Sequence, residues 1–335
     1  MKFKTFIGVD VSKLTLDVCL VREGRQVAHT VVSNDTKSLS SFFRKIKNTQ
    51  ELSSLLICAE HTGHYSNILR TYCLEHNISL WLESGAQINL SSGVQRSKSD
   101  RTDAHRIACY ASRYSDRARV ETIEPTALEE AKLLLSEREL YVRERAKYRA
   151  QIKDLRKFIS RPFYRDRKLR MDRHIKRLGK SIDQIDHRID ELFGSTEELT
   201  RQMEILQSVD GVGKQVALNT IIATHGFRKF KNGRQFACHS GVAPFKYTSG
   251  TSQRSRNKVS NRANKKLKTL FHMAALSAIR VNGEFKDYFE RKIAEGKNKM
   301  TVINAVRAKI INRIFALIRE NRTYEKKVKP KLHNP

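Results

Sequence analysis

The chain has 335 residues, of which 39% are hydrophobic, and its 65 Lys and Arg against 35 Asp and Glu give a formal net charge of +30. That apolar content excludes intrinsic disorder, and the charge favours a polyanionic partner, nucleic acid before a membrane surface. No apolar run approaches the roughly 18 residues of a membrane span, and the start MKFKTFIGVD lacks the apolar core of a secretory signal, so we expect a cytoplasmic protein. The five cysteines are scattered and contain no CxxC pair, so we expect reduced thiols and no zinc site.

The first hundred residues alternate between short β-rich runs and amphipathic stretches. Three β-rich runs follow one another, and helices and strands then alternate, which predicts a mixed α/β sheet with helices packed on it. The expected strands are 6–10, 16–21, 26–32, 55–60 and 78–82, and the expected helices are 38–47, 66–76 and 100–114.

The composition changes at about Glu121, and the following stretch to Arg201 is rich in Lys, Arg and Glu. A heptad spacing joins Ile175, Leu178, Ile182, Ile185, Ile189 and Leu192. A second helical stretch covers 128–159, so we expect an antiparallel helical hairpin with 161–173 between its arms. The apolar seam predicts a dimerising coiled coil; the alternative is a charged helical surface packed on its own domain.

The last part of the chain, from about Met203, contains the turn S-V-D-G-V-G at 208–213 between two expected helices. Such a turn is typical of helix-hairpin-helix elements, whose backbone amides hold a DNA phosphate. Between Asp210 and Glu284 there is no Asp or Glu, while the same interval carries fourteen Lys or Arg. This pattern predicts a folded helical domain with a surface suited to a phosphate backbone.

Four carboxylates form the candidate catalytic cluster. Asp10 and Glu60 each end an apolar strand, where a carboxylate is costly to bury unless it binds a cation or hydrogen-bond donors. Asp100 and Asp103 lie three residues apart at a helix start and therefore point to one face. Together the four could hold one or two Mg²⁺ ions for phosphoryl transfer; the alternative is a helix cap for Asp100 and surface positions for the others.

Several motifs, in order along essentially the whole chain, closely resemble one family. They are G-V-D-V-S-K at 8–13, A-E-H-T-G-H-Y at 59–65, K-S-D-R-T-D-A at 98–104, S-V-D-G-V-G at 208–213, F-A-C-H-S-G-V-A-P at 236–244 and Y-T-S-G-T-S at 247–252. The family is the DEDD-type bacterial insertion-sequence transposases, the group that includes the Piv and MooV invertases. The resemblance implies a RuvC-like, ribonuclease-H-type domain at 1–120, a coiled-coil helical hairpin at 121–202 and a mainly α transposase domain at 203–325, with a basic tail at 326–335.

The resemblance also implies the chemistry and the partners. The acidic tetrad falls on Asp10, Glu60, Asp100 and Asp103, as catalytic Mg²⁺ ligands, and the serine nucleophile on Ser249; Ser252 and Ser255 are neighbouring hydroxyls. A phosphoserine ester keeps the energy of the cut bond, so that strands are rejoined without ATP. The implied protein is a recombinase acting on donor and target DNA, directed by a structured non-coding guide RNA (a bridge RNA), as a homodimer or tetramer, and associated with the nucleoid when bound to DNA. Nucleic-acid contacts are expected from Lys214, Lys246, Arg254, Arg256, Lys258, Arg262, Lys265, Lys266 and Lys268.

Three other classes of protein fit less well. A Holliday-junction-resolving nuclease of RuvC type would need the four carboxylates but neither the serine nor the long basic C-terminal part. A sugar kinase of the actin superfamily would need a second Gly-rich phosphate loop late in the chain, which the sequence lacks. A binding protein with a degenerate site would not be expected to keep all four acids and the serine within their motifs.

Overall fold

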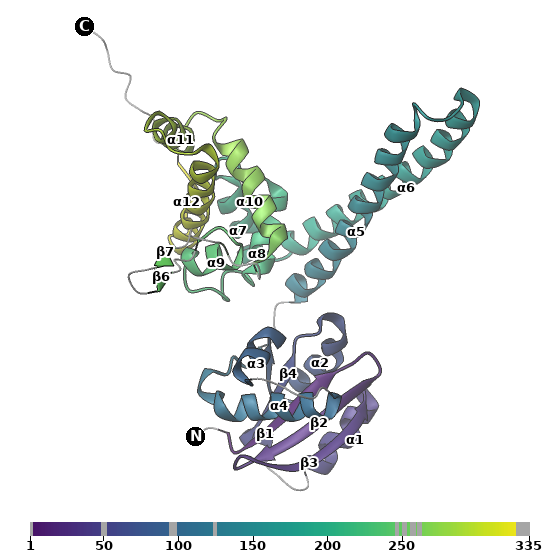
Figure 1. Ribbon diagram of the computed structural model, residues 1–335, viewed down its shortest axis with the longest axis vertical. Helices are drawn as coiled ribbons and strands as arrows, with labels where there is room; N and C mark the ends of the chain where they lie inside the picture. The colour runs from purple at the N-terminus through teal and green to yellow at the C-terminus, as the bar shows by residue number, and fades with distance from the viewer. Residues whose placement is uncertain are drawn as a thin grey trace. The chain divides into compact units, whose positions relative to one another are not determined.

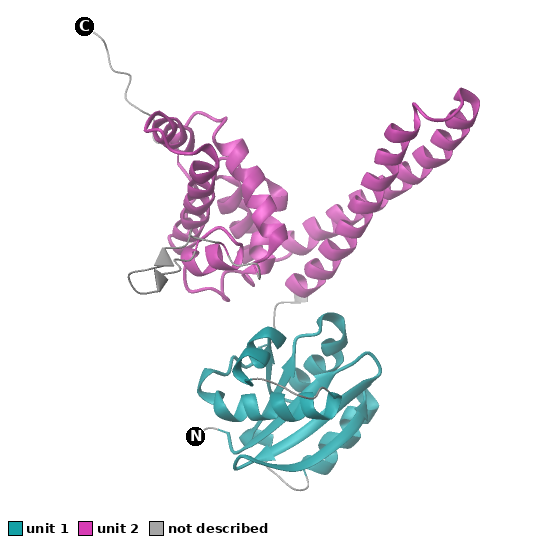
Figure 2. Cartoon of the chain, viewed as in Figure 1, with its two compact units in different colours: residues 1–123 teal, residues 124–335 magenta. Residues whose placement is uncertain are grey.

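The computed structural model describes residues 3–47, 52–93, 99–122, 126–244, 248–249, 253–254, 259 and 263–325. The chain forms two compact units, Met1–Ile123 and Glu124–Pro335, coloured teal and magenta in Figure 2. None of the helices in the described ranges is both long enough and apolar enough to cross a membrane.

A five-stranded sheet forms the first unit, in the order β3-β2-β1-β4-β5. Strands β1, β2 and β3 pair antiparallel, whereas β4 lies parallel to β1 and β5 parallel to β4. This mixed sheet fits the expected ribonuclease-H-type domain. The strands are β1 (Thr5–Val11), β2 (Thr15–Arg22), β3 (Arg25–Ser33), β4 (Leu55–Glu60) and β5 (Ser79–Glu83).

Helices cover both faces of this sheet (Figure 1). Helices α1 (Thr36–Lys47) and α2 (Asn67–Glu75) pack on one face, against side chains that include Ile7 and Val9. Helices α3 (Gly85–Ser91) and α4 (Asp100–Arg113) pack on the other, against Phe6 and its neighbours. Since successive residues of a strand point to opposite faces, β1 contributes alternate side chains to two separate cores. Short 3₁₀ turns occupy Leu52–Ser54, Gly63–Ser66 and Ser115–Arg117.

The second unit begins with a hairpin of two long helices, α5 (Thr126–Leu155) and α6 (Arg161–Gly194). The seam residues Ile182, Ile185, Ile189 and Leu192 are buried within this chain, and the last three belong to one core with Leu128 and Ala131 of α5. The interval 161–173 was predicted to lie between the arms, and this is wrong. Pro162 stands in the first turn of α6, where its fixed φ and missing N–H favour a helix start.

The remaining helices of the second unit form a bundle in which α12 packs against α9, α10 and α11. Their bounds are α7 (Glu197–Gln207), α8 (Lys214–Ala223), α9 (Gly233–His239), α10 (Lys265–Ala278), α11 (Glu284–Ala294) and α12 (Lys299–Arg319). Strands β6 (Thr248–Ser249) and β7 (Gln253–Arg254) pair antiparallel. In the predicted helix-hairpin-helix turn, Gly211 has a φ of 83°, and a Cβ there would lie 2.2 Å from the carbonyl oxygen of Ala274. This side of the turn therefore packs on α10.

Candidate active site

The strand register of the first unit aligns four carboxylates across one face of the sheet. Asp10 of β1 pairs directly with Asp17 of β2. Val9 pairs with Ala59, so that the next residues, Asp10 and Glu60, lie level on parallel strands. Glu60 in turn pairs with Glu83 at the end of β5. We call Asp17, Asp10, Glu60 and Glu83 the acidic row.

Helix α4 lies on the same face of the sheet, and Gly8 sets how closely it approaches. A Cβ at Gly8 would lie 2.2 Å from the carbonyl oxygen of Ala104 and from the backbone nitrogen of Ala108. Only a residue without a side chain lets the backbones of β1 and α4 come this close. Because Asp10 follows Gly8 by two positions, its side chain points to the α4 side of the sheet as well.

The start of α4 brings the third predicted acid to the row. Ser99 caps the helix: its hydroxyl accepts a hydrogen bond from the Thr102 amide, and the Thr102 hydroxyl accepts one from the Ser99 amide. This capping box fixes the turn that carries Asp100. Asp103 forms an ion pair with Arg106 one turn further along. The structure thus brings Asp10, Glu60 and Asp100 together, whereas Asp103 is engaged by an arginine of its own helix.

The electrostatics of Asp10 reflect the neighbouring acids. Burial raises the pKa of Asp10, and the negative charges of Asp100, Glu60 and Asp17 raise it further, while a hydrogen bond from the Val11 amide lowers it. A folded-state pKa above the unfolded value means that the ionised carboxylate destabilises the fold. A proton or a bound cation would relieve this unfavourable negative charge.

Carboxylate oxygens are the donors that a hard divalent cation prefers, so the chemistry of the cluster fits such an ion. Within the described ranges, however, no three His, Cys, Asp or Glu side chains converge on one point as a ready-made ion site. Side-chain rotations of the acids would have to complete the coordination.

Two members of the acidic row, Asp17 and Glu83, were not predicted from the sequence. His29 lies 3.2 Å from Asp17 through its Nε2 atom, and Tyr110 donates a 3.4 Å hydrogen bond from its hydroxyl to Glu83. Burial and the Glu83 charge raise the pKa of Tyr110 to about 12. Glu83 carries the same signal as Glu60, a carboxylate ending an apolar strand. Asp17 carries no such signal, because it lies inside its strand.

The predicted nucleophile belongs to the other unit. Ser249 lies in β6, and its backbone pairs with Gln253 of β7; its side chain lies outside the described part of the structure. Among the predicted nucleic-acid contacts, Arg254 lies in β7, and Lys246, Arg256, Lys258 and Arg262 lie outside the described residues.

The four other predicted contacts are lysines whose side chains the structure describes. Lys214 pairs with Asp190 at 2.6 Å, and Lys266 pairs with Glu139 at 3.0 Å, so acids of the helical hairpin neutralise both. Lys265 and Lys268 are exposed on α10. Exposed pairs contribute about 0–1 kcal/mol, so a phosphate would bind Lys214 or Lys266 only by displacing these acids, and both should contribute less to binding than the unpaired Lys265 and Lys268 side chains of the described part of α10.

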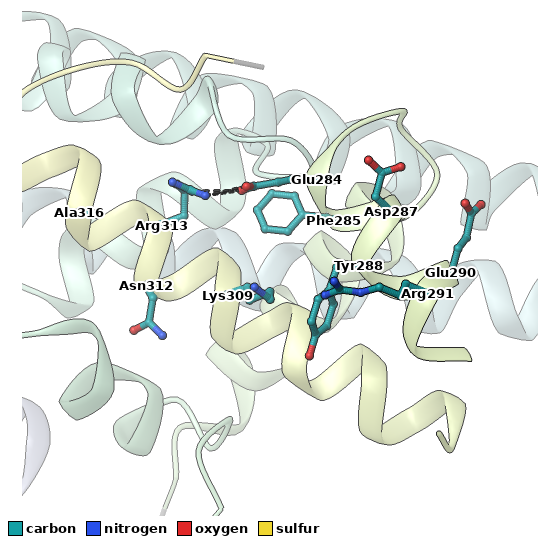
Figure 3. A pocket seen from close by; sticks show the side chains of 10 residues that line it. All are labelled: Glu284, Phe285, Asp287, Tyr288, Glu290, Arg291, Lys309, Asn312, Arg313 and Ala316. Atoms are coloured by element: carbon teal, nitrogen blue, oxygen red, sulfur yellow. Dashed lines mark hydrogen bonds and ion pairs between the residues drawn. The ribbon is translucent and has the colours of Figure 1, made fainter. Parts of the chain in front are cut away.

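A pocket of about 860 Å³ lies between α11 and α12 (Figure 3). Glu284 and Arg313 face each other across it and form a 2.6 Å ion pair, and the Lys309 ammonium lies 4.5 Å from the ring centroid of Tyr288. None of the predicted site residues lines this pocket. The ion pair and the cation–π contact join the two helices, so we assign the pocket to the packing of α11 on α12.

Comparisons with known proteins cover nearly the whole chain. A DEDD transposase model matches residues 7–160, and the model described as Transposase IS116/IS110/IS902 family matches residues 203–290. The chain is 26% identical to the pilin gene-inverting protein of Moraxella bovis, over 97% of this chain and 99% of that protein. It is 24% identical to the transposase for insertion sequence element IS1111A of Coxiella burnetii, over 97% and 92%.

Among solved structures, Thermus thermophilus RuvC in complex with a Holliday junction substrate aligns with 36% of this chain and 99% of its own, with a TM-score of 0.28 and 10% identity. The two family models match separate parts of the chain, in the order in which its motifs occur. Together with the two relatives that align over nearly their full length, they agree on one class of enzyme. The chain therefore belongs to the DEDD insertion-sequence transposases and is a DNA-recombining enzyme.

Proposed function

We propose that this enzyme cuts and rejoins DNA through a covalent phosphoserine intermediate on Ser249, with the carboxylates Asp10, Glu60, Asp100 and Asp103 binding divalent metal, Mg²⁺ by preference. The observation that carries the proposal is the alignment of Asp10 and Glu60 on one face of the sheet, with the charge of Asp100 close enough to help raise the pKa of Asp10. Such a cluster of negative charge is suited to binding a cation beside a DNA phosphate.

The proposed metal supplies charge neutralisation to the scissile phosphate. The chain's own residues supply the covalent step: the Ser249 Oγ attacks phosphorus, the Oγ–P bond forms, and the bond from phosphorus to one deoxyribose oxygen breaks. The hydroxyl proton leaves Ser249 for a base or for solvent, and the released deoxyribose oxygen takes up a proton. In rejoining, a deoxyribose hydroxyl attacks the phosphoserine and restores Ser249, so no external energy source is consumed.

In this proposal Asp103 changes partner during the reaction. Its ion pair with Arg106 holds it in the free protein, and a cation at Asp10 and Asp100 would compete for its carboxylate. Arg106 would then be released toward the DNA backbone.

The test is to trap the intermediate. Wild-type protein incubated with nicked donor DNA and Mg²⁺ should give a covalent adduct, which peptide mass spectrometry should place on Ser249. Ser249→Ala should bind the same DNA and give no adduct, while Ser252→Ala, a matched control in the same segment, should give wild-type amounts. An adduct on Ser252 or Ser255 would show that this serine, and not Ser249, is the nucleophile. Cleavage without any adduct would support the hydrolytic nuclease of RuvC type instead.

We also propose the partners: donor and target DNA, a structured non-coding RNA as guide, and a second copy of the chain in a dimer or tetramer. The support is the formal charge of +30 and the acid-free interval between Asp210 and Glu284, which suit extended phosphate backbones. Sequencing the RNA that copurifies with the protein from its native locus tests the guide. Enrichment of one transcript adjoining the gene supports it, and a profile that matches total cellular RNA contradicts it.

The division of labour along the chain follows the same proposal. Residues 1–120 would bind the metal, 121–202 would hold subunits together, and 203–325 would supply the serine and most nucleic-acid contacts, with 326–335 as a basic tail. Because the four acids and Ser249 belong to different units of the chain, cleavage would require both units to assemble on the DNA.

A further inference from the structure

Arg307 of α12 is a buried arginine without a carboxylate partner. Its side chain is 6% exposed, and within the described ranges it forms no ion pair. The surrounding sequence offers none either, because neither the interval 211–283 nor helix α12 contains an Asp or Glu. Buried guanidinium groups are normally paired with an anion, since their charge cannot be removed by deprotonation.

The contacts of Arg307 satisfy only part of its five N–H donors. Its Nη2 donates to Nδ1 of His272 on α10, and its Nη1 lies 3.5 Å from Oδ1 of Asn304 one turn earlier on α12. Its Nε is buried and has no hydrogen-bond partner among the described residues. Burial lowers the pKa of the Arg307 guanidinium, which is the direction expected for a charge without a neutralising neighbour.

His272 contributes a second donor to the same place. Arginine only donates, so Nδ1 of His272 must accept, and the ring is then neutral with its proton on Nε2. Burial and the neighbouring Arg307 charge lower the pKa of His272, which favours the neutral form of the ring. The ring is partly exposed, so the pair reaches the surface at His272.

The pair also lies at the end of a cationic strip on the bundle. Lys265, Lys268 and His272 follow one another along one face of α10. The Lys268 side chain packs beside Gly241, because a Cβ at Gly241 would lie 3.5 Å from Cδ of Lys268. Asn304, the neighbour of Arg307, donates to the carbonyl oxygen of Val242 at 2.9 Å, and Val242 stands seven positions before Ser249 in the sequence.

We propose that Arg307 and His272 form an anion-binding site that takes a phosphodiester group of the nucleic-acid backbone, delivered along the Lys265–Lys268 strip. The inference rests on the proposed function in one respect: the bound phosphate would be the one, or a neighbour of the one, that Ser249 attacks. Arg307 is then a positioning residue, and the missing counter-ion of the folded protein is supplied by the substrate. The proposed site would offer the phosphate two donors, the Arg307 Nε–H, which has no partner among the described residues, and the His272 Nε2–H.

Thermal unfolding of the full chain, with inorganic phosphate as the probe, tests the site without requiring cleavage. In phosphate-free chloride buffer, Arg307→Met should unfold at the wild-type temperature or above it, because it removes an uncompensated buried charge. Phosphate should raise the unfolding temperature of the wild type and not that of Arg307→Met. The matched control is Arg313→Met on the same helix, which loses its pair with Glu284 and should be destabilised yet keep the shift caused by phosphate.

Binding to DNA and RNA oligonucleotides completes the test, carried out in a Ser249→Ala background so that it does not depend on the nucleophile. Arg307→Met should weaken binding about tenfold or more, as expected for charge-assisted hydrogen bonds. If the affinity for one of the two nucleic acids, DNA or RNA, falls more than the other, the site binds the backbone of that nucleic acid. A purely structural arginine would instead lower the unfolding temperature without changing either the phosphate shift or binding, and this result would overturn the proposal. If Arg307→Met does not fold, His272→Ala decides: a loss of at least half of the phosphate shift supports the site, and an unchanged shift rejects it.

Discussion

Each unit of this chain contains one region in which charges of a single sign are concentrated, acidic in the first unit and basic in the second. On the sheet face of the first unit, Asp17, Asp10, Glu60 and Glu83 lie in one row, with Asp100 nearby. In the second unit the interval between Asp210 and Glu284 has no acid at all, and the buried Arg307 pairs with no carboxylate in the part of the chain that the structure describes. Under the proposed function, the acidic region would bind a small cation and the basic region a polyanion.

The largest expected effect lies in the acidic row. Asp10→Asn removes the carboxylate that lies between Asp17 and Glu60, and strand cleavage should fall by roughly a thousandfold or more, while DNA binding stays near wild type. A nicking assay with a parallel gel-shift measurement checks both. Wild-type protein in excess chelator should behave in the same way, and full recombination by either would remove the metal from the mechanism.

The unfolding temperature of Asp10→Asn at different pH values reports the charge repulsion at Asp10 independently of strand cleavage. The raised pKa of Asp10 means that its protonated form stabilises the fold below the unfolded pKa, and that this stability is lost as the pH rises through the folded pKa. At neutral pH and without metal, Asp10→Asn should therefore unfold at a higher temperature than the wild type. Mg²⁺ should stabilise the wild type and have little effect on the variant.

The next effect concerns the hairpin that begins the second unit. Replacing Ile182 and Ile189 by Asp places two charges in a buried seam, at a cost on the order of 3–5 kcal/mol for each uncompensated charge. Chemical denaturation should show the loss of stability, and light scattering reports the mass of the folded fraction. A stable monomer would show that dimerisation depends on an intact hairpin, and a stable dimer would place the dimer contact elsewhere.

A smaller effect on stability is expected at the closest approach in the first unit. Gly8→Ala introduces a methyl group 2.2 Å from the backbone of α4, and such overpacking costs about 1–3 kcal/mol. Because α4 carries Asp100, metal affinity should fall along with stability. Gly194→Ala, where a Cβ meets nothing within 4 Å, is the control and should be neutral or slightly stabilising; equal effects at both sites would mean that α4 adjusts freely.

The smallest effect concerns the lysines of α10. Changing Lys265 and Lys268 together to Met should reduce the slope of log affinity against log salt by about 0.9 for each phosphate contact that is lost. Lys266→Met is a control on the same turn, because Lys266 already pairs with Glu139 and should change the slope less. An unchanged slope in the double variant would exclude this face of α10 from the nucleic-acid surface.

Local signals in the sequence were sufficient to predict most elements of the first unit, because its strands are runs of apolar and β-branched residues with turn residues between them. Helix α3 was missed: it has only seven residues, too few to show a helical period. The start of α6 was placed too late, because the charged stretch at 161–173 was taken for a connection rather than for a helix opened by Pro162.

Only those residues of the candidate site that lie in sequence motifs could be predicted. Asp10, Glu60 and Asp100 each lie in a recognisable motif, and the structure brings them together. Asp17 could not be found because its proximity to Asp10 depends on the register of β1 against β2, which no local pattern specifies. The pairing of Lys266 with Glu139 was invisible for the same reason, since the two residues are far apart in the sequence.

The backbone contact at Gly8 offers a way to weaken the enzyme by degrees without touching any of its acids. Ala104 and Ala108 are fully buried where α4 meets β1. Larger side chains at these two alanines would lift the helix by graded amounts and carry Asp100 away from Asp10. A short series from Ala through Ser and Cys to Val at either position would thus yield recombinases that need increasing metal concentrations for activity, because the volume of one side chain sets the distance between Asp100 and Asp10.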